Sequence, residues 1–341
     1  MELLKRLCSA LFYGVCSFLI MVINKMILTT YKFPSFQFVA LGQMSATVLV
    51  LFTAKKLHVV DYPSFSLEII PKIWPLPLLY VGNLIFGLGG TKRLSLPMFT
   101  VLRRFSILFT MIGEKLLLGV NPPLTVQLTV YMMILGSIIA AVNDLSFDII
   151  GYFFVLTNNV FTAGTGVYVK KKLESKELGK YGLLFYNSLF MLPFATVFCW
   201  INDDFLKTWE YDGWSDPAFV SQFLVSCFMG FVLMYSVMLC TQFNSALTTT
   251  IIGCLKNIFV TYLGMMIGGD YVFSFYNFVG LNISIVGSII YSWVTFRQRD
   301  KPRADPLKPL SSAATTTGGI EFALLAMCSW LTGKRRRVQH L

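Results

Sequence analysis

Apolar runs as long as a membrane-spanning helix recur along most of the chain. About 20 residues of α-helix cross the hydrocarbon core of a bilayer, and polar breaks leave ten stretches near that length. Alternating segments of about 10 residues, which would indicate a membrane β-barrel, are not seen. The pattern therefore predicts an all-α membrane protein with ten transmembrane helices, at residues 8–30, 35–54, 74–91, 95–117, 124–143, 148–170, 180–201, 217–241, 245–268 and 275–296.

Basic side chains favour one side of this arrangement. Ten spans put both termini on the same side, where the loops hold Lys55, Lys56 and the lysine run 170–172. The opposite loops are mainly acidic, as at Asp203 and Asp204. Because loops rich in Lys and Arg stay in the cytosol, both termini are predicted to be cytosolic. The net charge of +11 reflects this asymmetry and the basic tail, so it does not indicate nucleic-acid binding.

Composition agrees with a membrane protein and gives no sign of catalysis. Only 13% of the residues are charged, against about 25% in soluble domains. The seven cysteines have no framework spacing, so neither disulfides nor a metal site is expected. Motifs for metal, nucleotide or nucleophilic chemistry are missing, and the two histidines, His58 and His340, fall in a loop and in the tail. The chain is therefore predicted not to be an enzyme and to need no cofactor.

One cation stands near the middle of the ninth predicted span. Lys256 lies in the run 244–270, among serine, threonine, glycine and asparagine residues. A charge at that depth costs roughly 3 kcal/mol on insertion scales and is a functional candidate by default. We expect Lys256 to face a central cavity and to meet an anion there. The alternative is that Lys256 pairs with a buried carboxylate or with backbone carbonyls of another helix.

The two halves of the chain match at this cation. When the fourth span is laid over the ninth, Arg103 falls on Lys256 and Arg104 on Asn257. Five spans reverse the direction of the chain, so 1–143 and 144–296 would form an inverted repeat, with 297–341 as a basic and largely disordered cytosolic tail. Transporters built in this way bind substrate near the bilayer midplane. The alternative is a chance match between two unrelated apolar helices.

These observations predict a secondary transporter for an anion such as a phosphate or diphosphate. The chain has no ATPase motif and would use a gradient or an exchange. The remaining polar residues at membrane depth are each read as structural more readily than as substrate ligands. They are Asn24, Lys25, Asn83, Asn158, Asn159, Tyr186 and Asn187.

Several runs resemble nucleotide-sugar transporters of the drug/metabolite transporter superfamily. The runs are SALFYGVCSFLIMVINK at 9–25, PLPLLYVGN at 75–83, LSLPMFTVLRRFSILFT at 94–110, SKELGKYGLLFYN at 175–187, NSALTTTIIGCLKN at 244–257 and FVGLNISIVGS at 278–288. The chain is most similar to the subfamily of the UDP-glucuronic acid/UDP-N-acetylgalactosamine transporter. The resemblance implies the drug/metabolite transporter fold, alternating access, and exchange of cytosolic UDP-sugar for lumenal UMP in the Golgi or endoplasmic reticulum.

The resemblance also implies site residues. In related GDP-mannose transporters an FYNN run and a GALNK run contact substrate; here they read Phe185 to Ser188 and Gly253 to Asn257, with the order of Lys and Asn exchanged. The fourth-helix cation of such transporters falls on Arg103. The predicted substrate-binding residues are Arg103, Tyr186, Asn187, Lys256, Asn257, Asn24, Lys25 and Asn83.

Some positions depart from the subfamily pattern and leave the cargo open. Leu84 and Phe86 are apolar where polar residues are usual, and Asn159 and Thr165 stand where Asp and Asn are expected. The UDP-sugar would be UDP-glucuronic acid, UDP-N-acetylgalactosamine or UDP-N-acetylglucosamine. The alternatives are a GDP-mannose or sugar-phosphate exchanger on the same fold, or a non-transporting scaffold that recruits partners through its tail. The expected partners are the lipid bilayer and the two exchange substrates, UDP-sugar and UMP. Nucleic acid is not expected, and a homodimer stays open.

Overall fold

Helices form all the regular structure in the residues that this computed structural model describes, namely 2–94, 96–141, 148–267 and 275–298. The predicted all-α class is confirmed for these residues. The helices, in chain order, are α1 (Glu2–Lys25), the π-helix η1 (Met26–Thr30), α2 (Phe36–Lys56), α3 (Ile69–Ile73), α4 (Leu76–Arg93), α5 (Leu96–Leu102), α6 (Phe105–Leu118), α7 (Leu124–Ala141), α8 (Ile149–Ser175), α9 (Gly179–Ile201), α10 (Asp204–Trp209), the 3₁₀-helix η2 (Asp212–Ser215), α11 (Pro217–Phe243), α12 (Ala246–Ile267) and α13 (Phe275–Gln298).

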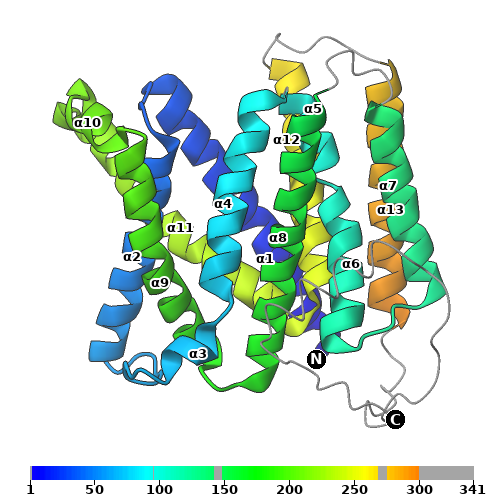
Figure 1. Cartoon of the computed structure of the whole chain (residues 1–341), viewed down its shortest axis with the longest axis horizontal. Coiled ribbons are helices and arrows are strands. Elements are labelled where there is room, and N and C mark those ends of the chain that lie inside the picture. Colours follow the sequence, from blue (N-terminus) through cyan, green and yellow to red (C-terminus); the bar gives the residue numbers. More distant parts are fainter. Residues whose placement is uncertain (1, 95, 142–147, 268–274, 299–341) are drawn as a thin grey trace, which may run out of the picture. The chain divides into compact units, whose positions relative to one another are not determined.

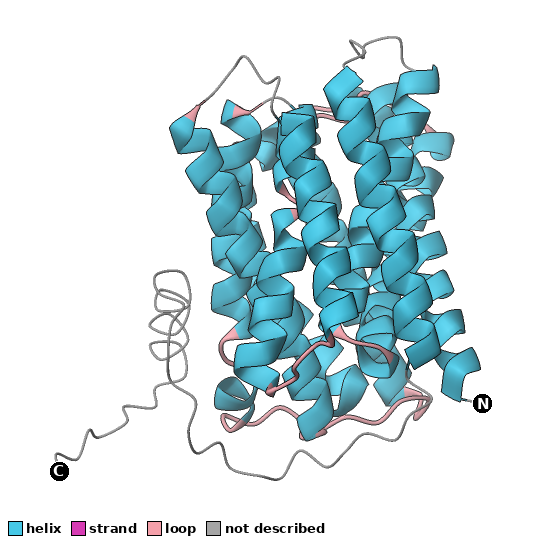
Figure 2. Ribbon diagram, turned by 90° about the vertical axis from the view of Figure 1, so that its right-hand side faces the viewer, coloured by secondary structure: helices cyan, strands magenta, loops and turns pink. Residues whose placement is uncertain are grey.

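Within the described ranges, five helical stretches are long and apolar enough to cross a membrane. Shorter apolar stretches occur in α4, α7 and α12. The helices run side by side, with most of the described loops at their two ends (Figure 2). The five stretches are Leu3–Thr30, Phe36–Lys56, Gly179–Ile201, Pro217–Phe243 and Phe278–Thr295.

Polar side chains at the start of several helices explain where those helices begin. The Ser35 hydroxyl accepts a hydrogen bond from the Phe38 N–H of α2 at 3.0 Å. The Asp148 carboxylate accepts from the Ile150 N–H of α8 at 3.0 Å, and Asp216 caps α11 in the same way. Such caps satisfy backbone N–H groups that have no partner inside the helix. The caps of α8 and α11 fix the ends of two helices that surround the site.

The predicted fourth span, a single helix at 95–117, is wrong in one respect. The structure divides it into α5 and α6, and Arg103 and Arg104 lie between them. The Leu102 carbonyl oxygen accepts a hydrogen bond from the Asn159 side chain of α8, at 2.8 Å. A side chain that enters the hydrogen-bond ladder of a helix is a known cause of such breaks. The break places both arginines where the helix changes its course.

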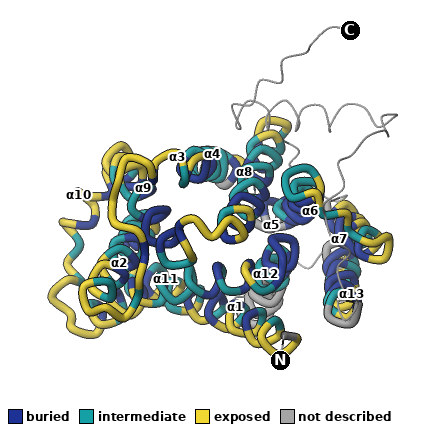
Figure 3. The backbone as a smooth tube through the Cα atoms, turned by 90° about the horizontal axis from the view of Figure 1, so that it is seen from below, coloured by how far each residue is buried: buried dark blue, intermediate teal, exposed yellow. Residues whose placement is uncertain are grey.

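The packing brings distant parts of the chain together. The most extensive helix contacts join α7 with α13, α4 with α8, and α1 with α11. Figure 1 shows the helices in the colours of the sequence, and Figure 3 shows the same neighbours in a view along them. The pair of α7 and α13 approaches so closely that a Cβ atom on Gly280 would overlap the carbonyl oxygen of Gly136. Small residues permit this approach between membrane helices.

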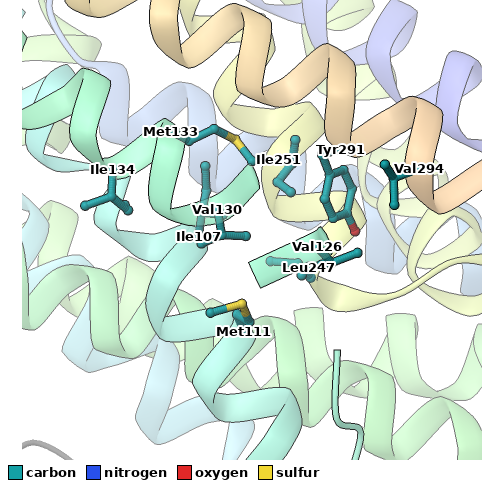
Figure 4. Close-up of a cluster of buried hydrophobic side chains, with 10 residues drawn as sticks. All are labelled: Ile107, Met111, Val126, Val130, Met133, Ile134, Leu247, Ile251, Tyr291 and Val294. Carbon is teal, nitrogen blue, oxygen red and sulfur yellow. The ribbon is translucent and has the colours of Figure 1, made fainter. Parts of the chain in front are cut away.

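An apolar cluster holds α6 and α12 against α7 and α13 (Figure 4). Leu247 and Ile251 of α12 meet Ile107 and Met111 of α6 in this cluster, and Tyr291 joins them from α13. The cluster therefore fixes the two helices that bring the predicted cations of the site. Its buried members are Ile107, Met111, Val126, Val130, Met133, Ile134, Leu247, Ile251, Tyr291 and Val294.

Candidate functional site

A cavity of about 320 Å³ lies between α1, the junction of α5 with α6, α8, α11 and α12. Three cationic residues, Arg103, Arg104 and Lys256, line it. The cavity thus brings together the two cations that the repeat pattern paired. Its described lining residues are Tyr13, Arg103, Arg104, Ser106, Thr162, Thr165, Gly166, Val169, Val237, Thr241, Ala246, Thr249, Thr250, Gly253, Cys254 and Lys256.

The cavity has a strong excess of positive charge. Among its described lining residues none is Asp or Glu. Arg103 is stabilised by an aromatic ring, since its guanidinium lies 5.7 Å from the ring centroid of Phe99. Like charges that share a buried space repel each other strongly because the protein interior screens them poorly. An anion in the cavity would relieve this repulsion, whereas the alternative of a carboxylate partner for Lys256 finds no support in the described lining.

Arg104 is tethered to α13. Its Nη1 atom donates to the hydroxyl of Ser284 in α13 at 2.9 Å, and that hydroxyl donates to the Met133 carbonyl of α7 at 2.9 Å. Arg104 falls on Asn257 when the two halves of the chain are aligned, but it was not among the predicted site residues. The signal that could have identified it was the presence of two adjacent arginines in one apolar run.

Hydroxyl groups form much of the rest of the cavity wall. Thr249 and Thr241 share a hydrogen bond at 3.1 Å across α12 and α11, and Thr250 meets Thr110 of α6 at 3.3 Å. Hydroxyls can donate to phosphate oxygens and accept from sugar hydroxyls. The threonines beside Lys256 in α12 stood out in the sequence, but the whole group could not be predicted because its members come from five separate elements. The hydroxyl-bearing residues of the lining are Tyr13, Ser106, Thr162, Thr165, Thr241, Thr249 and Thr250.

Two predicted residues of α9 lie outside this described lining. Tyr186 is buried and donates its hydroxyl to the carbonyl oxygen of Pro63 at 2.7 Å. Its ring packs against Tyr62 with the centroids 6.1 Å apart. Asn187 is buried next to it in the same helix. In this structure the hydroxyl of Tyr186 therefore holds the loop before α3 against α9.

The other predicted residues form helix contacts or lie near the cavity. The Asn24 Oδ1 atom accepts from Gln43 Nε2 at 3.1 Å and from the Ser226 hydroxyl at 2.7 Å, which joins α1, α2 and α11. Lys25 is the last residue of α1. Asn83 accepts a hydrogen bond from the hydroxyl of Thr162, a cavity residue, at 3.2 Å.

Asn257 completes the predicted set. It follows Lys256 in α12, and its side chain lies outside the described residues. Its part in the site therefore stays a prediction.

The turn between α11 and α12 is held by side chains of other helices. Lys170 of α8 donates from Nζ to the carbonyl oxygens of Gln242 at 3.1 Å and Asn244 at 3.0 Å. Asn244 in turn donates to the carbonyl oxygen of Arg6 in α1 at 3.2 Å. These bonds fix the start of α12, two to three turns before Lys256.

Comparison with known proteins places the chain among membrane transporters. The sequence profile of the Triose-phosphate Transporter family matches residues 5–292. The Drosophila melanogaster UDP-sugar transporter UST74c is 55% identical over 87% of this chain and 80% of its own length. The Caenorhabditis elegans UDP-sugar transporter sqv-7 is 54% identical over 87% of this chain and 91% of its length. The Homo sapiens nucleotide sugar transporter SLC35D2 is 51% identical over 87% of this chain and 88% of its own length.

The fold has also been seen before. A solved protein structure covers 86% of this chain and 99% of its own, with a TM-score of 0.55 and 12% sequence identity. The sequence relatives confirm the resemblance found from the motifs. Because the family and these relatives are transporters, the prediction of a membrane transport protein, as opposed to an enzyme, is confirmed. The chain belongs to the Triose-phosphate Transporter family.

Proposed function

We propose that the protein exchanges a UDP-sugar for UMP across its membrane, with the diphosphate held by Arg103, Arg104 and Lys256. The observation that carries this proposal is the convergence of three cations in a cavity whose described lining holds no carboxylate. Guanidinium groups bind phosphate oxygens in a bidentate manner, and an ammonium adds a compact charge. A cavity of about 320 Å³ falls within the range of about 300–1,000 Å³ typical of ligand pockets.

The choice of a uridine nucleotide rests on the relatives. Two of the proteins that are more than 50% identical are named UDP-sugar transporters. The hydroxyl-rich wall supports a sugar nucleotide over a bare phosphate, because the threonines of α8 and α12 offer several donors and acceptors. UDP-glucuronic acid, UDP-N-acetylgalactosamine and UDP-N-acetylglucosamine are the proposed cargoes.

The proposed architecture is ten spans in two inverted repeats, 1–143 and 144–296. The helix contacts support it through an internal symmetry. If α5 and α6 are counted as one span, each helix has a counterpart five spans further along the chain: α8 for α1, α9 for α2, α11 for α4, α12 for α5 with α6, and α13 for α7. When every helix is replaced by its counterpart, the contact of α1 with α11 becomes the contact of α8 with α4, which is also observed. The contact of α1 with α12 likewise becomes that of α8 with α6, and the contacts of α2 with α9, α7 with α13 and α6 with α12 map onto themselves. This correspondence supports the proposed repeat.

The proposed orientation places both termini and the tail, 297–341, in the cytosol of a Golgi or endoplasmic reticulum membrane. The asymmetric distribution of Lys and Arg among the loops supports this orientation. The cargo would then enter the lumen as UMP leaves it. Insertion of a glycosylation sequon into the loop 202–216 and, separately, into 57–68 tests the orientation: only the first should be glycosylated.

The function is tested by exchange in proteoliposomes. Purified protein would be reconstituted with internal UMP or GMP and offered labelled UDP-glucuronic acid, UDP-N-acetylgalactosamine, UDP-N-acetylglucosamine and GDP-mannose. Uptake of a UDP-sugar that depends on internal UMP supports the proposal. Uptake with GMP alone favours GDP-mannose, and no exchange by folded protein removes the proposed function.

A native cysteine tests the location of the binding site. Cys254 lines the cavity, so a UDP-sugar should slow its alkylation. A variant with the exposed Cys8 changed to Ser, and with Cys328, which lies outside the described residues, also changed to Ser, simplifies the labelling. Cys254→Ser gives the background. Lys256→Ala should abolish both exchange and this protection without loss of folded protein. Full activity in that variant contradicts the assigned site.

A further inference from the structure

A side chain from a separate helix holds the break between α5 and α6. Asn159 of α8 is fully buried, and its Nδ2 atom donates to the Leu102 carbonyl oxygen at 2.8 Å. In an uninterrupted α-helix this carbonyl would accept from the N–H four residues later, that of Ser106. The Ser106 N–H instead donates to the carbonyl oxygen of Arg103 at 3.1 Å. The amide of Asn159 therefore takes the place of a backbone donor.

The backbone around this point is tightened into 3₁₀ geometry. The Arg104 N–H donates to Val101 at 3.2 Å, and the Ile107 N–H donates to Arg104 at 3.0 Å, each over three residues. A residue in a 3₁₀ turn winds roughly 20° further than one in an α-helix. The tightened turn thus sets the rotation of α6 relative to α5. It also sets the directions in which the side chains of Arg103 and Arg104 leave the backbone.

Asn159 itself is not among the described residues that line the cavity, whereas both arginines are. Any effect of its amide on an anion in the cavity must pass through the position of the arginines. We propose that Asn159 is a positioning residue: its hydrogen bond to Leu102 holds the helix junction in the form that aims Arg103 and Arg104 at the anion. This rests on the proposed function, in which that anion is the diphosphate of a UDP-sugar.

If the amide of Asn159 is removed, the junction between α5 and α6 can respond in two ways. The Leu102 carbonyl either remains without a donor in a membrane-buried place or regains the Ser106 N–H. The first course is unfavourable because a buried acceptor is desolvated without compensation. The second restores a regular helix and rotates the arginines away from their present directions. In both cases the arginines lose their present positions, so anion binding becomes weaker although Asn159 does not touch the anion.

The chain offers a matched control one residue away. Asn158 is also buried in α8, but its Nδ2 atom donates to the backbone carbonyl of Asn83 at 2.7 Å, toward α4. The two residues therefore share type, helix and burial. They differ in that Asn159 alone bonds to the junction that carries the arginines. Asn158→Leu should lower thermal stability with little change in affinity.

Equilibrium binding tests the proposal, with UDP and inorganic pyrophosphate as probes of purified protein. Asn159→Leu should weaken the binding of both probes about tenfold, equivalent to about 1.4 kcal/mol, and should raise the KM of exchange to a similar degree. Asn158→Leu should keep the wild-type affinity for pyrophosphate, because its partner Asn83 is not among the described residues that line the cavity. If Asn159→Leu is not recovered as monodisperse protein, Asn159→Ser repeats the measurement.

A double-variant cycle separates positioning from general destabilisation. In an Arg103→Gln background, Asn159→Leu should weaken UDP binding less than it does in the wild type, because one of the groups that it positions is already lost. Equal effects in the two backgrounds overturn the proposal, as does wild-type affinity in Asn159→Leu.

The same measurements keep the two proposals distinguishable. Wild-type protein that binds pyrophosphate but exchanges no UDP-sugar contradicts the proposed function, and the comparison of Asn159 with Asn158 then still tests the positioning role. Wild-type exchange with no difference between the two asparagine variants contradicts only the positioning role.

Discussion

Glu114 of α6 accepts a hydrogen bond at 3.0 Å from the backbone N–H of Leu247, in the first turn of α12. The two residues join the helix that follows Arg104 to the helix that carries Lys256. A carboxylate at a helix N-terminus satisfies a backbone donor and interacts favourably with the helix dipole. Glu114 is buried, so water does not replace it.

Removal of this cap should destabilise the protein. Glu114→Ala is expected to lower the free energy of unfolding by about 1–2 kcal/mol, the usual cost of a lost N-cap. Glu114→Gln keeps an acceptor oxygen and loses only the charge, which should cost about 0.3–1 kcal/mol. Thermal unfolding in detergent measures both. Equal losses in the two variants would mean that the charge, and not the hydrogen bond, stabilises α12.

Lys170 should control access to the cavity from the end at which α12 begins. Lys170→Met removes the donors to Gln242 and Asn244, and the loosened turn should make Cys254 more reactive toward a charged thiol reagent added from that side. Lys171→Met is the matched control, since Lys171 is exposed and lies over the Tyr168 ring. Unchanged Cys254 reactivity in Lys170→Met would show that the turn does not close the cavity.

Gly280 should tolerate no side chain. A Cβ atom there would overlap backbone atoms of Gly136 and Ala140, so Gly280→Ala is expected to cost about 1–3 kcal/mol of stability through overpacking. Gly14→Ala provides the contrast. Its Cβ would meet only Ile252 at 3.9 Å, and alanine favours a helix over glycine by up to about 1 kcal/mol. Thermal unfolding of the two variants should shift in opposite directions.

Asp204 should make stability depend on pH at the start of α10. Burial raises the pKa of this carboxyl above its ordinary value. The folded state therefore favours the protonated form. The resulting stabilisation is complete below the unfolded pKa of about 3.9 and is lost as the pH rises through the raised pKa. Asp204→Asn resembles the protonated form and should remove this loss at neutral pH.

Thermal unfolding at several pH values from about 4 to 8 tests this assignment. Asp61→Asn is the control because Asp61 is an exposed carboxylate in a different loop. A fall in the melting temperature of Asp204→Asn at neutral pH would indicate that the charged carboxylate is stabilising after all.

The sequence pattern was sufficient to predict Lys256 and Arg103 as site residues, but not the helix break at which Arg103 lies. Lys256 and Arg103 stood out because a charge in a long apolar run is costly, and that cost can be read from composition alone. The break at Arg103 and Arg104 was missed because its cause is the Asn159 side chain, 57 residues further along the chain. A contact of that range leaves no local signal, and the run TVLRRFSILFT is by itself a good helix.

Polar residues in the predicted spans illustrate the same limit. Asn24 and Asn83 are as unusual in an apolar helix as a ligand-binding residue would be, yet in this structure both accept hydrogen bonds from neighbouring helices. Sequence records that a polar group is buried but not which partner it meets. The threonines of α12 stood out beside Lys256, but their meeting with the lining threonines of α8 and α11 could not be predicted, because residues of separate helices leave no joint pattern in the sequence.

The excess of positive charge in the cavity has a consequence for the transport cycle. To pass from one side to the other, the proposed carrier must close the cavity and expel the water that screens Arg103, Arg104 and Lys256. An empty carrier meets this electrostatic barrier in full, whereas a bound diphosphate or monophosphate acts as its counter-ion. Return of the unloaded protein is then slow compared with return of the loaded one. Because the unloaded carrier returns slowly, uptake of UDP-sugar is coupled tightly to release of UMP. The charge imbalance alone is sufficient for this coupling.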